Sequence, residues 1–158
     1  MSIALGTAAV PSPTCFAGLV LTPIAPWSDE YLTGDAIIDF QHKNLFALVN
    51  QLHCLIQWGR GADTIAAHLE EILRCTTEHF AMEEERMAAL GYDHLEAHAK
   101  RHLALQERIQ SALDKTRNNP SQLPADVSAC LSDWIAHHIK GDDRRMMEFF
   151  RQAAEPQA

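Results

Sequence analysis

Four stretches of the chain repeat apolar residues at intervals of three and four positions, which is the spacing of one buried face of an α-helix. Helix-breaking residues separate the stretches, at Gly59 and Gly61, at Gly91, and in the segments 117–120 and 120–124. No segment of five or more residues shows the apolar/polar alternation of a half-buried strand. The pattern therefore predicts helices over about 35–58, 63–91, 93–117 and 125–151.

Short connections between these helices favour antiparallel neighbours. The expected fold class is all-α, an antiparallel up-down-up-down four-helix bundle with an N-terminal extension. We expect residues 1–28 to form an apolar, Pro-containing extension, residues 29–152 the bundle and residues 153–158 a C-terminal tail. Asp35 and Asp63 are the predicted N-caps of the first two helices, and Gly91 is the predicted C-cap of the second.

Charge and cysteine content narrow the class of protein. The formal net charge of −8 and the lack of a basic tract argue against nucleic acid as a partner. The four cysteines stand singly, which fits a reducing, cytoplasmic setting better than a disulfide scaffold. Residues 1–28 lack a basic start and are interrupted by prolines, so we expect neither a signal peptide nor membrane insertion. We expect a monomer.

Histidine is abundant, with nine in 158 residues, and its placement is informative. Pairs four residues apart share one helical face, and each expected helix carries at least one inward candidate. The candidates are His42 on the first helix, His79 and Glu83 on the second, His98 and His102 on the third, and His138, Asp142 and Asp143 on the fourth. Five imidazoles with two carboxylates form a mixed nitrogen and oxygen donor set that suits iron or manganese.

Two metal ions fit this donor set better than one. If both carboxylates and one solvent-derived oxygen bridge a pair of six-coordinate ions, one of the coordination positions stays open. An open position on a redox-active pair is where a small ligand such as O₂ would bind. Helical spacing selects Asp142, four residues after His138, whereas Asp143 is rotated away by about 140° on a regular helix. Gly141, unfavourable in a helix interior, could mark a distortion that turns Asp143 inward.

Several segments resemble the successive signatures of the hemerythrin family, and together they span about residues 27–150. The resembling segments are 38–42 (IDFQH), 79–84 (HFAMEE), 91–92 (GY), 98–102 (HAKRH) and 134–143 (WIAHHIKGDD). The resemblance implies the same up-down-up-down bundle, of which a member of this family is itself a standard example.

The resemblance also implies a ligand set. It assigns His98, His102 and His138 to one iron and His42 and His79 to the other, with Glu83 and Asp143 as bridges; at the last position the family pattern selects Asp143 over Asp142. The implied cofactors are two non-haem iron ions with an oxo or hydroxo bridge, and O₂ as the ligand of the iron held by His42 and His79.

The expected function is therefore reversible O₂ binding for storage, delivery or buffering, without enzymatic turnover. Dioxygen is the expected partner, together with an O₂-consuming enzyme or a signalling protein. One alternative is a module that senses O₂, NO or redox state through a partner. Another is a slow di-iron oxidase, or detoxification of peroxide or iron, although the Glu-x-x-His pairs of carboxylate-rich di-iron proteins do not occur in this sequence.

Other residues near the candidates are expected to play lesser parts. His53, His68, His94 and His137 do not match ligand positions and are expected at the surface or around the site. Glu84 and Glu85 are expected on a solvated face, with Glu84 still able to orient a ligand. Apolar residues of the second and fourth helices are expected to wall the O₂ pocket: Phe80, Trp134, Ile135 and Ile139.

Overall fold

Helices make up most of the chain that this computed structural model describes, residues 22–121 and 126–154. Within these ranges the structure contains no strand. The α-helices are α1 (Ala36–Gln57), α2 (Ala62–Leu90), α3 (Leu95–Asn118), α4 (Val127–His138) and α5 (Arg144–Ala154). Two short helical turns complete the set: the 3₁₀ turn η1 (Asp29–Tyr31) and the π-helical turn η2 (Ile139–Asp143).

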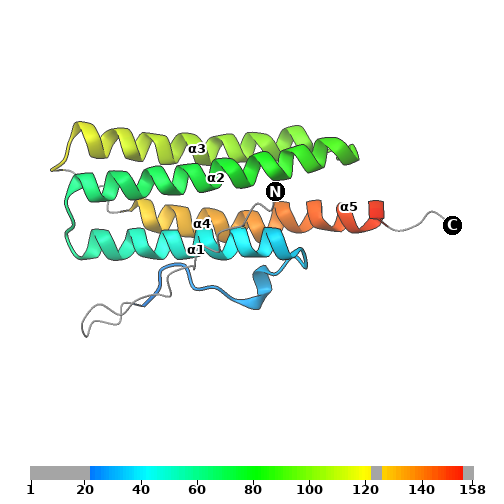
Figure 1. Ribbon diagram of the computed structural model, residues 1–158, viewed down its shortest axis with the longest axis horizontal. Coiled ribbons are helices and arrows are strands. Elements are labelled where there is room, and N and C mark those ends of the chain that lie inside the picture. Colours follow the sequence, from blue (N-terminus) through cyan, green and yellow to red (C-terminus); the bar gives the residue numbers. More distant parts are fainter. Residues whose placement is uncertain (1–21, 122–125, 155–158) are drawn as a thin grey trace, which may run out of the picture.

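The helices lie side by side as a bundle, with α4 and α5 arranged end to end along one axis (Figure 1). The π-helical turn η2 joins these two helices without a break in the helical chain, so α4, η2 and α5 together form the fourth rod of the bundle. The predicted all-α four-helix bundle is therefore confirmed.

Helix ends follow the predicted chemistry at two of three positions. The Asp35 side chain accepts hydrogen bonds from the backbone N–H groups of Ile37 and Ile38, which are free in the first turn of a helix. Gly91 ends α2 in the left-handed conformation, with φ of 69°. The cap at Asp63 was wrong: the N-cap of α2 is Gly61, two residues earlier. Asp63 lies inside the first turn, where its negative charge interacts favourably with the helix dipole.

Two apolar clusters fill the interior of the bundle. The larger contains residues such as Val49, Leu69 and Ile109 from α1, α2 and α3. The smaller consists of Ile38, Met87, Met146, Met147 and Phe150, contributed by the start of α1, the end of α2 and α5. The segment of α1 between the two clusters, from Ile38 to Leu45, carries His42. A buried polar layer is therefore enclosed by apolar packing along the bundle.

The segment before α1 packs along the bundle instead of leaving it. Trp27 and Tyr31 both lie against Phe46 of α1, with ring centroids 5.3 Å and 4.7 Å from that ring. The backbone N–H and C=O of Ala25 both bond to the Asn50 side chain at 2.8 Å. The predicted boundary after residue 28 stays a prediction, and residues 1–21 of the expected extension and 155–158 of the expected tail lie outside the described residues.

Among the helices of the described ranges, none combines the length and the apolar character that a membrane crossing requires.

Candidate metal centre

Seven side chains from the four rods of the bundle converge on one buried layer. They are the seven predicted ligands, and each is at most 5% exposed: His42, His79, Glu83, His98, His102, His138 and Asp143. Their nitrogen and oxygen atoms form two groups, each with all members within 4.8 Å of one another. The structure therefore brings together every residue of the predicted set.

One group contains two histidines. The Nε2 atoms of His42 and His79 lie 3.1 Å apart. Glu83 Oε1 lies 3.4 Å from His79 Nε2, and Asp143 Oδ2 lies 3.2 Å from His42 Nε2. We call these four residues the two-histidine group.

The other group contains three histidines. The Nε2 atoms of His102 and His138 lie 3.0 Å apart. Glu83 Oε2 lies 3.3 Å from His102 Nε2, and Asp143 Oδ1 lies 3.2 Å from His98 Nε2 and 3.0 Å from His138 Nε2. We call these five residues the three-histidine group.

The two carboxylates are shared between the groups in the same way. Glu83 turns Oε1 toward the two-histidine group and Oε2 toward the three-histidine group. Asp143 likewise turns Oδ2 to one side and Oδ1 to the other. A carboxylate that offers one oxygen to each of two neighbouring positions has the geometry of a bridge between two cations.

The unpaired polar atoms of this layer fit a pair of metal ions. Both oxygens of Glu83, both oxygens of Asp143 and Nε2 of His98 are buried and find no hydrogen-bond partner among the described residues. Buried polar atoms are normally satisfied, because leaving them bare is costly. Adjacent ligands of a six-coordinate ion with bonds of about 2.1 Å lie about 3 Å apart, close to the spacing found between the donors here. The cluster is therefore able to hold metal ions.

Asp143 reaches this layer because of the π-helical turn η2. A π-helix closes its hydrogen bonds over five residues rather than four, so a residue five positions after His138 lies nearer to the face of His138 than it would on a regular α-helix. The side chain of Asp143 is fully buried, whereas that of Asp142 is 12% exposed. The local distortion expected near Gly141 is present, and it turns Asp143 inward where regular helical spacing selects Asp142.

The far ring nitrogens of His79 and His102 have partners that differ in charge. His79 Nδ1 lies 2.9 Å from Gln41 Oε1, an amide oxygen. His102 Nδ1 lies 2.8 Å from the Glu84 carboxylate, so Glu84, expected on a solvated face, also orients this imidazole. Sequence reasoning assigned no role to Gln41, because its contact crosses from α1 to α2 and leaves no trace in the spacing along either helix.

Burial and charge shift the acidity of these groups in opposite directions. Burial lowers the pKa of His79 to about 4. Burial also opposes the charged form of His138, but the contacts with Asp142 and Asp143 outweigh it and raise its pKa to about 9. Burial and mutual repulsion disfavour the ionised carboxyls of Glu83 and Asp143, yet the surrounding imidazoles hold the pKa of both below the usual values. The carboxylates are thus kept charged, as ligands for cations must be.

A small cavity lies beside the two-histidine group. Its volume is about 10 Å³, close to the room that one water molecule needs. The four apolar residues expected to wall an O₂ pocket all border it: Phe80, Trp134, Ile135 and Ile139. His42, His79 and Asp143 of the two-histidine group border it as well, and so does His138 of the three-histidine group.

The histidines expected to lie outside the ligand set are absent from both groups. His53 Nδ1 lies 3.1 Å from Ser128 Oγ, and His68 Nε2 lies 2.8 Å from the Leu48 carbonyl oxygen. His137 Nδ1 lies 2.6 Å from the Asp133 carbonyl oxygen. Each of these three imidazoles thus has a hydrogen-bonding partner outside the two groups.

Known proteins with similar sequences belong to the family that the sequence motifs resemble. Residues 33–150 match the family model described as "Hemerythrin HHE cation binding domain". A bacteriohemerythrin of Pseudomonas aeruginosa is 32% identical over 127 residues, which is 80% of this chain and 82% of that protein. A bacteriohemerythrin of Stenotrophomonas maltophilia is 29% identical, over 75% of this chain and 76% of that protein.

A solved structure, described as that of a leucine-to-phenylalanine mutant, superposes with a TM-score of 0.74 at 25% sequence identity. The match covers 80% of this chain and 97% of the solved one.

Proposed function

The chain belongs to the hemerythrin family, and from that premise we propose that it binds O₂ reversibly at two non-haem iron ions. The proposed ligands of one iron are His98, His102 and His138, and those of the other are His42 and His79. Glu83 and Asp143 would bridge the two, since each carboxylate turns one oxygen toward each group. Iron supplies the electrons by which O₂ is held, and the protein supplies the ligands, the cavity and the exclusion of water.

The small cavity is the observation that carries this proposal. It borders both imidazoles of the two-histidine group but only one imidazole, that of His138, of the three-histidine group. The two-histidine group has one imidazole fewer, so an open coordination position would lie on that side. Its volume of about 10 Å³ suits a diatomic molecule and not a larger organic substrate. Its largely apolar wall excludes water and protons, which favours release of O₂ over its reduction.

The same features favour a binding protein over an enzyme. The donor set is rich in histidine. Both carboxylates lie between the two groups as bridges, so neither is left to act on a substrate. We propose a cytoplasmic monomer that stores, delivers or buffers O₂ for an O₂-consuming enzyme or a signalling protein.

The test is a reversible spectral change. The iron-loaded protein is reduced anaerobically, exposed to O₂ and then flushed with argon while its visible spectrum and iron content are recorded. We expect two irons per chain and a charge-transfer absorption that appears with O₂ and disappears with argon. An irreversible change to the oxidised form with turnover of peroxide would instead support an oxidase or detoxifying role, and failure to retain iron would refute the proposal.

Iron stoichiometry tests the assignment of the ligands. His102 belongs to the three-histidine group alone, whereas Asp143 belongs to both groups. We expect His102→Ala to weaken one iron position and leave the other occupied, and Asp143→Ala to lower the occupancy of both. Equal iron contents in the two variants would contradict a bridging role for Asp143.

One feature favours sensing as the alternative function. The segment before α1 is tied to the turn that carries Asp143: Lys140 Nζ lies 2.6 Å from Glu30 Oε2, and Arg144 donates to the Glu30 carbonyl oxygen at 2.9 Å. A change at the metal centre could therefore reach the surface through this segment. Hydrogen exchange of residues 22–35 with and without O₂ distinguishes the two functions, because a storage protein requires no difference there.

A further inference from the structure

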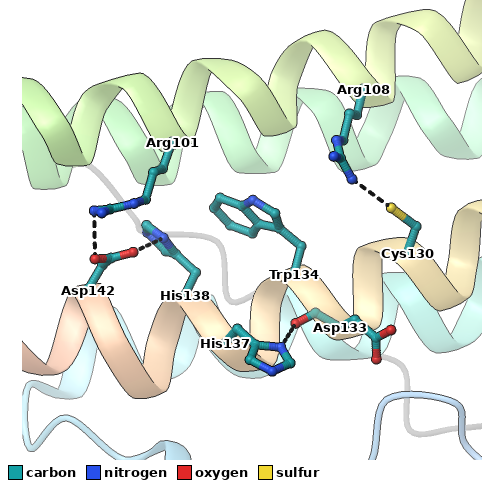
Figure 2. A pocket seen from close by; sticks show the side chains of 8 residues that line it. All are labelled: Arg101, Arg108, Cys130, Asp133, Trp134, His137, His138 and Asp142. Carbon is teal, nitrogen blue, oxygen red and sulfur yellow. Dashed lines mark hydrogen bonds and ion pairs between the residues drawn. The ribbon is translucent and has the colours of Figure 1, made fainter.

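A surface groove of about 550 Å³ runs between α3 and α4, on the outer side of the three-histidine group. Figure 2 shows Arg101 and Arg108 reaching across it from α3, with Trp134 between them and His138 and Asp142 beneath Arg101. One carboxylate in this groove, that of Asp142, contacts a proposed metal ligand.

Asp142 is held from two sides. Its Oδ1 atom accepts hydrogen bonds from Arg101 at 2.7 Å and from Arg145 at 2.6 Å. Its Oδ2 atom lies 3.2 Å from Nδ1 of His138. Arg101 belongs to α3 and Arg145 to α5, so two different helices fix the direction in which this carboxylate points.

His138 needs an acceptor at that position. Its Nε2 atom faces the shared carboxylates, and a metal bound there leaves the ring proton on Nδ1. Nδ1 of His138 is buried, and no residue of the described chain satisfies it in a well-formed hydrogen bond. The Asp142 carboxylate, 3.2 Å away, is the acceptor poised to take that proton once the metal fixes it.

We propose that Asp142, clamped by Arg101 and Arg145, is a positioning residue that fixes the imidazole of His138 for metal binding. The inference rests on the proposed function, since it presumes the metal centre. In this role Asp142 is not a bridging ligand. It lies outside the ligand layer and acts on the metal centre through His138.

The supports of the two groups differ in chemistry, which makes the role selective. In the three-histidine group, carboxylates face the Nδ1 atoms of two imidazoles: Glu84 faces His102, and Asp142 faces His138. In the two-histidine group, the amide of Gln41 stands behind His79, and Nδ1 of His42 has no partner among the described residues. A carboxylate behind a metal-bound imidazole raises its basicity more than an amide does. Loss of the Asp142 charge should therefore weaken the three-histidine position alone.

The experiment is a titration of the full-length, metal-free protein with Co²⁺, followed by its visible absorption. We expect the wild type to bind two ions and Asp142→Asn to weaken one of the two steps by about 10- to 100-fold, the usual cost of removing such a support. Arg101→Gln should weaken the same step by less, because Arg145 still holds the carboxylate. Arg108→Gln is the matched control: it lies in the same groove on the same helix but contacts Cys130 Sγ, at 3.1 Å, and should leave both steps unchanged.

The outcomes separate this inference from the proposed function. If the wild type binds two ions and Asp142→Asn binds both with unchanged affinity, the positioning role is wrong and the metal centre stands. If Asp142→Asn weakens both steps equally and lowers the melting temperature of the metal-free protein, Asp142 is a structural residue and the inference is likewise refuted. If the wild type itself binds no ions, the proposed function fails first.

Discussion

The ring of Phe80 lies flat on the imidazole of His102, with centroids 3.7 Å apart and planes within 4° of parallel. The same ring borders the small cavity and lies 5.6 Å from the ring of His79. Phe80 thus contacts histidines of both groups, and it is 3% exposed. One apolar side chain therefore supports the metal centre and closes the space beside it.

Phe80→Ala should cost about 3–5 kcal/mol of unfolding free energy, because it leaves a cavity beside the buried imidazoles. The matched control is Phe40→Ala in α1, where the ring is 58% exposed and the cost should stay within about 0.5 kcal/mol. Urea unfolding of both metal-free variants measures the difference. Similar losses in the two variants would show that Phe80 does not pack as the structure indicates.

Trp134 and His138 are the two residues that border both the small cavity and the surface groove, so their side chains lie between the two spaces. The ring of Trp134 is stacked on His138, with centroids 4.3 Å apart. Trp134→Ala should join the two spaces and admit water, so we expect the O₂-bound form to decay several-fold faster to the oxidised protein. Trp134→Phe keeps a ring in place and should decay more slowly than the alanine variant. Decay rates are read from the loss of visible absorption, and identical rates in all three proteins would contradict a sealing role.

Gly141 lies in the middle of the π-helical turn, yet a Cβ atom there would meet no atom within 4 Å. Gly141→Ala should therefore raise the free energy of unfolding by about 0.4–1 kcal/mol, through a less flexible unfolded chain, and leave metal binding intact. Gly91→Ala provides the contrast, because its φ of 69° strains an alanine by about 1–2 kcal/mol. A loss of metal in Gly141→Ala would mean that the turn requires glycine.

The stability of the metal-free protein should be greatest near pH 6.5. Burial lowers the pKa of His79 to about 4. As the pH falls from 6.5 to 4, His79 therefore binds a proton in the unfolded chain but not in the folded chain, and the free energy of unfolding decreases. Burial is outweighed at His138 by contacts with Asp142 and Asp143, which raise its pKa to about 9, so stability is lost as the pH rises from 6.5 to 9.

Urea unfolding across this pH range checks the prediction. His79→Gln should flatten the acid side of the profile and His138→Gln the alkaline side. A stability that rises steadily from pH 5 to pH 9 would show that these two histidines do not titrate as their surroundings indicate.

Local patterns in the sequence predicted the helices and most of the donor set. Periodicity located four helical rods because an amphipathic helix repeats its buried face at a fixed interval. The pairs His79 with Glu83 and His98 with His102 followed from the same rule, since residues four apart share a face. The cap at Asp63 was misplaced because Gly61 can also start a helix, and propensity alone does not choose between neighbours.

The inward direction of Asp143 depends on the π-helical turn, which breaks the periodicity that sequence reasoning uses. Regular helical spacing favours Asp142 as the ligand, whereas the family pattern selects Asp143. In the structure the π-helical turn directs Asp143 into the buried layer. Asp142 instead lies at the surface groove and accepts a hydrogen bond from Arg101. Helical spacing is a property of one helix about its own axis, so the sequence by itself determined which residues share a face. Which faces meet, and so the contacts of Gln41 with His79 and of Arg101 with Asp142, was decided only by the tertiary structure, because those contacts join different helices.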